Sequence, residues 1–223
     1  MLEGSGMRLF SQHRYVSLLA VLLIATSNFG HAITLPVTDD VWIQENNPAA
    51  GNPEVLRVTQ GAASRPGRLT FLNFSLAAMP ELTTGAEIET ATLRLWVQRV
   101  RRGGTLNLNV VTSGWDEDNV NALLPPLSDF VSQFQVEDAQ VGRFLEVDIT
   151  GVVQSWLDYP SSNLGLMLQG SGRVNLNLSS QESLDGLPAE IEIVMSATQG
   201  PEGPAGADGT QGPAGPAGAT GPA

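Results

Sequence analysis

Hydrophobic and polar residues alternate with a period of two along most of the central chain, which is the pattern of β-strands that bury one face. One clear row of aliphatic residues runs through positions 91–97, and a second row runs through positions 106–110. Arginine and glycine at positions 101–104 separate the two rows and favour a tight turn. We therefore expect these two segments to pair as a β-hairpin.

The segment 143–168 predicts a strand, a short helix, a turn and a second strand. Its first residues alternate, whereas the apolar residues from Val152 to Leu157 fall at helical spacing. The Thr150 hydroxyl is placed to cap the helix, and Pro160 is expected to end it. A helix of two turns is not stable alone, so we expect it to lie as a lid on one end of a β-sandwich.

Further short strands follow the same alternation, and a polar stretch at 115–140 is predicted as a long loop. Many short strands with little helix predict an all-β fold, specifically an antiparallel β-sandwich with one short helix. Trp42 and Trp156 are assigned to its core. The additional strands are expected near 41–43, 55–58, 69–76, 174–178 and 191–195.

The N-terminal residues have the composition of a secretory signal peptide. Basic residues precede an apolar run at 16–25, and the small residues Gly30 and Ala32 follow it. We assign residues 1–32 to this signal. The apolar run is about half as long as a bilayer-spanning helix, so a retained membrane anchor is the weaker alternative. The protein is thus expected to be secreted or displayed at the cell surface, with no membrane span after cleavage.

The C-terminal segment 199–223 has glycine at every third position without a break. Only glycine fits at the crowded axis of a collagen triple helix, so this period predicts a collagen-like segment that associates as a homotrimer. A flexible Gly/Pro-rich linker is the alternative, although it would not keep a strict period of three. The predicted triple-helix glycines are Gly200, Gly203, Gly206, Gly209, Gly212, Gly215, Gly218 and Gly221.

Charge and residue types exclude several functions. The chain has 23 Asp and Glu against 11 basic residues, all of them Arg, and its formal net charge is −12. An acidic surface disfavours nucleic acid and anionic membranes as partners. Both histidines, His13 and His31, belong to the predicted signal, and Lys and Cys are absent. The remaining chain therefore lacks the usual nucleophile pairs, Schiff-base lysine and zinc ligands, and we expect no enzyme, cofactor or metal site.

Asp116, Glu117 and Asp118 form a cluster with other possible chemistry. They could serve as a glycosidase acid and base, or as a calcium site. Three adjacent residues of one loop cannot place two carboxylates on opposite sides of a glycosidic bond. We therefore interpret them as structural acids of a solvated loop.

Seven segments together resemble the DNRLRE-domain family of secreted microbial proteins, which is also classed as a carbohydrate-binding module. The resemblance covers roughly residues 38–196, and it implies a jelly-roll sandwich similar to the growth-factor-propeptide fold, with non-catalytic attachment to glycans. The absence of Lys and the negative charge argue against an anionic, alginate-type polysaccharide. The matching segments are 40–43 (DVWI), 68–75 (RLTFLNFS), 88–97 (IETATLRLWV), 115–117 (WDE), 148–156 (DITGVVQSW), 163–168 (NLGLML) and 179–183 (SSQES).

Carbohydrate recognition needs an exposed aromatic ring beside planar amide or guanidinium groups that bond to hydroxyls. Arg94, Trp96 and Gln98 share the outward face of one predicted strand, and Asn107 and Asn109 would lie on the strand that faces it. These five residues are the candidate glycan-binding site. The alternative is that Trp96 is covered by the lid helix or the long loop. Two further amides, Asn175 and Asn177, are interpreted as a solvated sheet face.

Two hypotheses follow for the function. The first is a secreted or surface-displayed, non-catalytic head domain that binds a polysaccharide or surface glycan and is carried on a trimeric collagen-like stalk. The second is a purely structural component of an extracellular fibre, without a specific ligand. A polysaccharide-cleaving enzyme ranks third, because the side chains for most catalytic mechanisms are absent.

Overall fold

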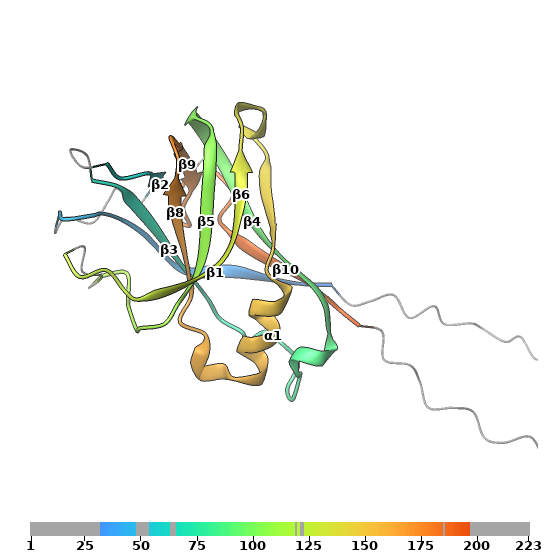
Figure 1. The fold of residues 1–223 in the computed structure, drawn as a ribbon. Coiled ribbons are helices and arrows are strands. Elements are labelled where there is room, and N and C mark those ends of the chain that lie inside the picture. Colours follow the sequence, from blue (N-terminus) through green and yellow to red (C-terminus); the bar gives the residue numbers. More distant parts are fainter. Residues whose placement is uncertain are drawn as a thin grey trace, which may run out of the picture.

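Ten β-strands and one α-helix form the part of the chain that the computed structural model describes, namely residues 32–47, 54–62, 66–118, 120, 123–184 and 186–196 (Figure 1). The predicted signal peptide, except Ala32, and the collagen-like segment 199–223 lie outside these residues, and both stay predictions. The strands are β1 (Ala32–Gln44), β2 (Val55–Thr59), β3 (Arg68–Phe74), β4 (Ile88–Arg102), β5 (Gly104–Val111), β6 (Ser128–Val136), β7 (Phe144–Asp148), β8 (Leu166–Ser171), β9 (Asn175–Ser179) and β10 (Glu190–Met195).

Six of the strands close into a ring because β1 and β4 each belong to two sheets. The first half of β1 pairs with β10, and its second half pairs with β3. The first half of β4 pairs with β10 and β7, and its second half pairs with β9. The ring runs β1-β10-β4-β9-β2-β3, and β8, β5 and β6 continue the sheet beyond β3. Every one of these pairs is antiparallel.

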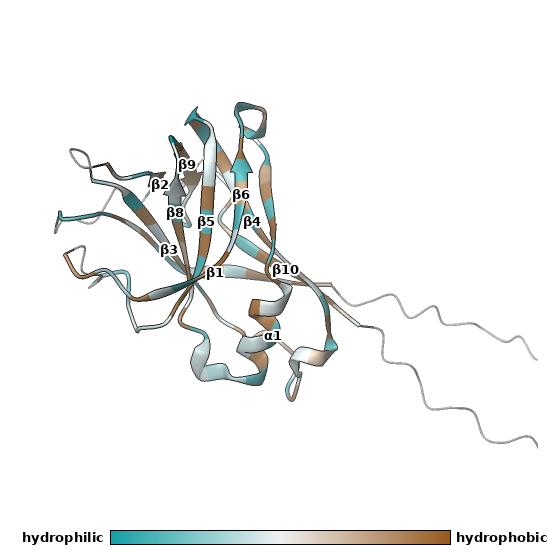
Figure 2. Ribbon diagram, viewed as in Figure 1, coloured by the Kyte–Doolittle hydropathy of each residue, from teal (hydrophilic) through white to brown (hydrophobic). Residues whose placement is uncertain are grey.

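The main hydrophobic core fills the space that these strands enclose. Alternate side chains of β4, β5, β9 and β10 point into it, and the same alternation appears as hydrophobic and hydrophilic bands along the strands in Figure 2. Leu93, Leu106, Leu176 and Ile191 are fully buried there. The predicted inward row at 91–97 is therefore confirmed.

Helix α1 (Thr150–Asp158) covers one end of this core (Figure 1). Val153 and Trp156 are its buried residues, and the helix stops before Pro160 as the sequence predicts. The prediction that Thr150 caps the helix is wrong. Ile149 is the N-cap residue, and the Thr150 hydroxyl instead donates to Asp148 Oδ1 (2.6 Å) and accepts from the Ala91 N–H (2.9 Å). No helix in the described residues is long and apolar enough to cross a membrane.

A second, smaller hydrophobic cluster lies on the opposite face of β1, β3 and β8. Trp115, from the segment that follows β5, packs on Phe71 with 5.5 Å between ring centroids, and its indole N–H donates to Leu164 O (2.8 Å). This segment was predicted to continue as loop to residue 140. It instead contains β6, a strand whose alternation is hidden because it lies at a sheet edge and carries polar residues on both faces.

The prediction of an all-β fold with one short helix is confirmed. The more specific prediction of a jelly-roll sandwich is not settled by the strand pairings, which describe a ring of six strands, and it stays a prediction.

Gly165, just before β8, offers a test of this packing. Its φ angle is +89°, and a Cβ built there would lie 2.5 Å from Leu72 O in β3. The Gly165→Ala variant should lower the free energy of unfolding by at least about 2 kcal/mol, because both the backbone conformation and the space exclude a side chain. Urea unfolding of the purified protein measures the change.

Gly151→Ala is the matched control, since Gly151 lies in α1 and a Cβ there meets nothing within 4 Å. Alanine in an exposed helix should raise stability by about 0.5–1 kcal/mol. Equal effects of the two substitutions would contradict the described packing of Gly165 against β3.

Candidate functional site

Arg94, the first predicted site residue, is held in a network of charges on β4. Its guanidinium contacts the Glu190 carboxylate and lies 3.6 Å from Glu146 and 3.7 Å from Glu192. It also lies 4.1 Å from the centre of the Phe144 ring. Three carboxylates therefore compensate its positive charge, which leaves little of it for a ligand.

Trp96 and Gln98 continue the same face of β4. Trp96 is half-buried and meets Phe144 edge-on, with 5.2 Å between the ring centroids. The Gln98 amide donates to Ser183 Oγ (3.0 Å). A cavity of about 390 Å³ lies beside these two side chains and is also lined by Leu184. Phe144 covers part of the Trp96 ring, and Val141 lines the same cavity.

Asn107 and Asn109 do not lie beside Trp96, because the predicted hairpin does not form. β5 pairs with β6 and β8, whereas the end of β4 pairs with β9. Gly103 and Gly104, which join β4 to β5, do not form a hairpin turn. They lie where the chain passes close to neighbouring backbone. A Cβ at Gly103 would lie 2.7 Å from Val136 O, and one at Gly104 would lie 3.0 Å from Val174 N. Asn109 is buried and donates to Met167 O (3.4 Å), whereas Asn107 lines a separate cleft.

The sequence interpretation missed a group of five arginines near the end of β4 that lies away from α1 (Figure 1), where Arg57 pairs with Asn177 on the face of β2 and β9 opposite the main core. We call this group the arginine mouth. Its inner part is a cavity of about 150 Å³, and its outer part is a cleft of about 660 Å³. Asn175 and Asn177, interpreted from sequence as a solvated sheet face, line the inner cavity. The five residues are Arg57 of β2, Arg68 of β3, Arg101 and Arg102 of β4, and Arg173 before β9.

Trp42 of β1 supports two of the three arginines that line the inner cavity, Arg57 and Arg68. The Arg57 guanidinium lies 5.2 Å from the ring centre and that of Arg68 lies 5.4 Å from it. Arg68 Nη2 also donates to the Gln44 side chain (3.3 Å), and Arg57 Nε is buried without a hydrogen-bond partner in the described part of the chain. Trp42 is buried, as the sequence predicts, but by guanidinium groups as well as by the core.

No carboxylate lines the inner cavity or the outer cleft of the arginine mouth among the described residues. Arg57, Arg101, Arg102 and Arg173 also form no ion pair with a described carboxylate. A local excess of positive charge is thus concentrated within a chain whose net charge is −12. Such a cleft attracts carboxylate, sulfate or phosphate groups, which guanidinium groups bind in pairs of hydrogen bonds.

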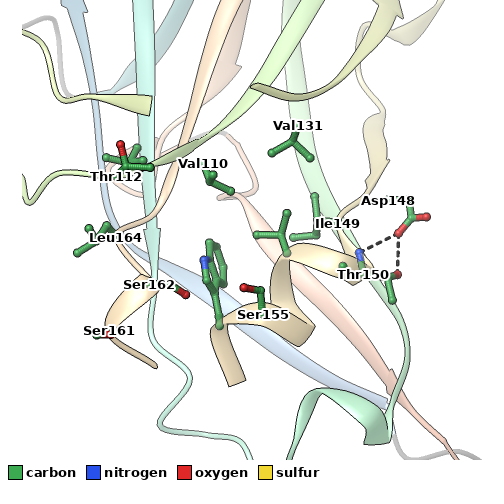
Figure 3. A pocket seen from close by; sticks show the side chains of 14 residues that line it. Val110, Thr112, Val131, Asp148, Ile149, Thr150, Ser155, Ser161, Ser162 and Leu164 are labelled. Atoms are coloured by element: carbon green, nitrogen blue, oxygen red, sulfur yellow. Dashed lines mark hydrogen bonds between the residues drawn. The ribbon is translucent and has the colours of Figure 1, made fainter. Parts of the chain in front are cut away.

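A groove of about 680 Å³ beside α1 has different chemistry (Figure 3). Val110, Val131 and Leu164 point toward it, and hydroxyl groups such as Ser155 stand at its rim. Its one carboxylate, Asp148, accepts hydrogen bonds from the Thr150 hydroxyl and N–H, which lower the pKa of Asp148. The groove therefore offers an apolar surface but no pair of acid and base groups.

Asp40 of β1 is the most strongly perturbed acid among the described residues. Burial, together with the nearby carboxylates of Glu182 and Glu117, raises the pKa of Asp40 to about 7. Hydrogen bonds from the Ser180 hydroxyl (2.8 Å) and the Gln181 N–H (2.8 Å) act in the opposite direction. The Ser180 hydroxyl also contacts the Glu182 carboxylate, and it has a single hydrogen to donate. A protonated Asp40 that donates to Ser180 satisfies both contacts.

The acids at 116–118 take part in this structural arrangement. Glu117 accepts a hydrogen bond from the Gln181 side chain (3.4 Å), and partial burial together with Glu182 raises the pKa of Glu117. Within the described ranges, no group of three or more acidic, His or Cys side chains is arranged to hold a metal ion.

The described residues form an all-β domain with several clefts at its surface. A family model for carbohydrate-binding module family 96 matches residues 28–193, and the chain belongs to this family. A search among curated proteins finds no match. Membership supports a carbohydrate-binding function, and modules of this kind are generally non-catalytic and typically extracellular or surface-associated. The predicted resemblance to carbohydrate-binding modules is thus confirmed, whereas the DNRLRE assignment stays a prediction.

The Asp40→Asn variant tests the protonation of the buried acid. Asparagine can keep both contacts, because its amide accepts from Gln181 N and donates to Ser180 Oγ. The pKa of Asp40 is raised in the folded state, so its stabilising contribution is complete only below its ordinary pKa and is lost as the pH rises through about 7. The variant should match the wild type near pH 4 and exceed it by on the order of 3 kcal/mol near pH 7.

Urea unfolding between these two pH values measures the difference between variant and wild type. Asp129→Asn is the control, because Asp129 is exposed on β6 and should not change the profile. A wild-type protein that gains stability relative to Asp40→Asn as the pH rises would contradict a protonated Asp40.

Proposed function

We propose that the domain is a non-catalytic glycan-binding head and that the arginine mouth holds an acidic sugar. The supporting observation is the set of five arginines of the mouth, two of them placed against the Trp42 ring, in clefts that no described carboxylate lines. Family membership supports carbohydrate as the ligand class. Guanidinium groups recognise the carboxylate of a uronic acid or a sulfate ester through paired hydrogen bonds.

This proposal departs from our expectation that the negative net charge argues against an anionic polysaccharide. Net charge describes the molecule at long range, and salt screens it beyond about 8–10 Å. A ligand inside the mouth is in direct contact with guanidinium groups, so the local charges decide its binding. The inward-lying position of Arg57 and Arg68 also reduces screening by solvent.

We further propose that the head, residues 33–198, is secreted after removal of residues 1–32 and is carried on a trimeric collagen-like stalk at 199–223. The placement of the termini supports this arrangement. Ala32 pairs with Val194, and the Ser196 N–H donates to Glu87 O (2.8 Å), just before β4 begins. The arginine mouth lies at the far end of β4, at most about 45 Å away by strand geometry. A stalk that begins after residue 196 would thus present the mouth outward.

The face formed by Arg94, Trp96 and Gln98 remains a second proposed contact surface, because the half-exposed ring of Trp96 borders a cavity. A sugar could stack on that ring. Its cation is neutralised by neighbouring acids, however, so this face would contribute to binding a neutral part of a glycan.

The Arg101→Ala/Arg173→Ala double variant tests the arginine mouth. We expect it to weaken binding to polygalacturonate by about tenfold to a hundredfold, because two charge-assisted contacts are lost. Isothermal titration calorimetry at low and physiological salt measures the affinity, which should fall as salt is added. Arg143→Ala, an exposed arginine outside the mouth, is the matched control and should bind as the wild type does. The proposal fails if no acidic polysaccharide binds, or if both variants behave alike.

Truncation after Gln199 tests the stalk. Three linked heads should bind a surface coated with polysaccharide far more tightly than one head, by about a hundredfold or more. The truncated protein should therefore keep its affinity for a soluble oligosaccharide but lose retention on the surface. Surface plasmon resonance and calorimetry give these two quantities. Complete loss of both would favour the purely structural role, and unchanged surface retention would contradict a multivalent head.

A further inference from the structure

A second cleft borders the arginine mouth. It has a volume of about 710 Å³ and opens on the outer side of β5 and β8. Gln60, Gly61, Ala62 and Pro66, from the connection between β2 and β3, line both this cleft and the outer cleft of the arginine mouth. The two clefts therefore share that connection as a common wall and are neighbours on the surface. We call the second one the amide cleft.

The two clefts have opposite electrostatic character. Among the described residues, four arginines and no carboxylate line the outer cleft of the arginine mouth, whereas the amide cleft has the carboxylate of Glu45 and no cation. Glu45 is fixed in place, because its Oε2 accepts a hydrogen bond from the Gly67 N–H (2.8 Å). A Cβ on Gly61 or Gly67 would come within 2.8 or 2.6 Å of that oxygen, so both glycines are needed for its approach. An acidic sugar is favoured in the first cleft and repelled from the second.

Amide side chains provide the hydrogen-bonding groups of the amide cleft. Asn107 of β5 and Gln169 of β8 are directly paired across the sheet, and both are half-buried. Each primary amide can donate two hydrogen bonds and accept through its oxygen, which suits sugar hydroxyl and acetamido groups. Asn109 and Gln98 use their amides within the protein, but the side chains of Asn107 and Gln169 make no hydrogen bond to another described residue. Gln60, which is exposed, adds a third amide at the border.

We propose that the two clefts are neighbouring subsites for one glycan chain, with an acidic sugar in the arginine mouth and an uncharged sugar in the amide cleft. The ligand class is then a heteropolysaccharide in which a uronic acid is bonded to an uncharged sugar, and not a polymer of uronic acid alone. This proposal rests on the proposed function of the arginine mouth. It assigns a role to Asn107, one of the residues singled out from sequence, but with β8 and not β4 as its neighbour.

The test compares tetrasaccharides of equal length by calorimetry with the whole mature chain. Hyaluronan, unsulfated chondroitin and heparosan tetrasaccharides all alternate glucuronate with an uncharged N-acetylhexosamine. Tetragalacturonate carries only acidic sugars, and chitotetraose carries only uncharged ones. At least one alternating tetrasaccharide should bind about tenfold more tightly than tetragalacturonate, because two amide contacts are added and repulsion by Glu45 is avoided. Chitotetraose should bind most weakly.

The Asn107→Ala/Gln169→Ala double variant locates the second subsite. It should lose about tenfold in affinity for the alternating tetrasaccharide and nothing for tetragalacturonate. Asn107→Asp keeps the side-chain shape but adds a second negative charge to the cleft. It should lower the affinity for the alternating tetrasaccharide, and it is the alternative test if the double variant does not fold. The inference is overturned if tetragalacturonate binds as tightly as all three alternating ligands, or if neither variant affects them. Absence of binding by every acidic tetrasaccharide would instead reject the arginine mouth itself.

Discussion

Closure of six strands into a ring is the constraint on which the rest of the structure depends. Because β1 and β4 each pair in two sheets, both strands contribute buried side chains to the main core, Leu35 from β1 and Leu93 and Leu95 from β4 among them. The chain has no cysteine, so packing and strand pairing hold the ring without disulfides. At one end α1 seals the interior with Trp156 and Val153. At the other end of β4, Arg57, Asn175 and Asn177 line the arginine mouth from the face of β2 and β9 opposite the core, because the residues that alternate with them, Leu56, Leu176 and Leu178, fill the core.

The order of elements was largely predictable from sequence because buried faces leave a period of two. The strand rows at 91–97 and 144–148, the short helix and its end before Pro160 follow from patterns within about ten residues. Local patterns do not state which strands are neighbours. From sequence, the glycines at 103 and 104 are compatible with a hairpin turn. The structure shows instead that they allow close approach to the backbone of Val136 and Val174. The edge strand β6 escaped detection because neither of its faces is uniformly apolar.

The candidate site was less predictable for the same reason. Arg94, Trp96 and Gln98 were found together because they are close in sequence, and the structure keeps them together on β4. The five arginines of the mouth come from strands β2, β3 and β4 and from the turn before β9, and each is unremarkable in its own segment. Strand pairing gathers them, because β9 pairs with β2 and with the end of β4 and so brings together residues that are far apart in the sequence. The net charge of the whole sequence adds these arginines to the acidic residues elsewhere, so it does not reveal the local positive charge.

The contrast between Arg94 and Arg57 explains how a protein can hold a guanidinium rigidly and still leave its charge available. Arg94 is fixed by three carboxylates and Phe144, and its charge is balanced within the protein. Arg57 is fixed by the face of Trp42, which attracts the cation through its ring quadrupole and adds no net charge. The planar donors at the edge of a stacked guanidinium remain directed outward. An aromatic support is therefore suited to a site that must bind an anion, whereas a carboxylate support would compete with the ligand. Trp42, buried in the DVWI segment, thus has a role beyond core packing.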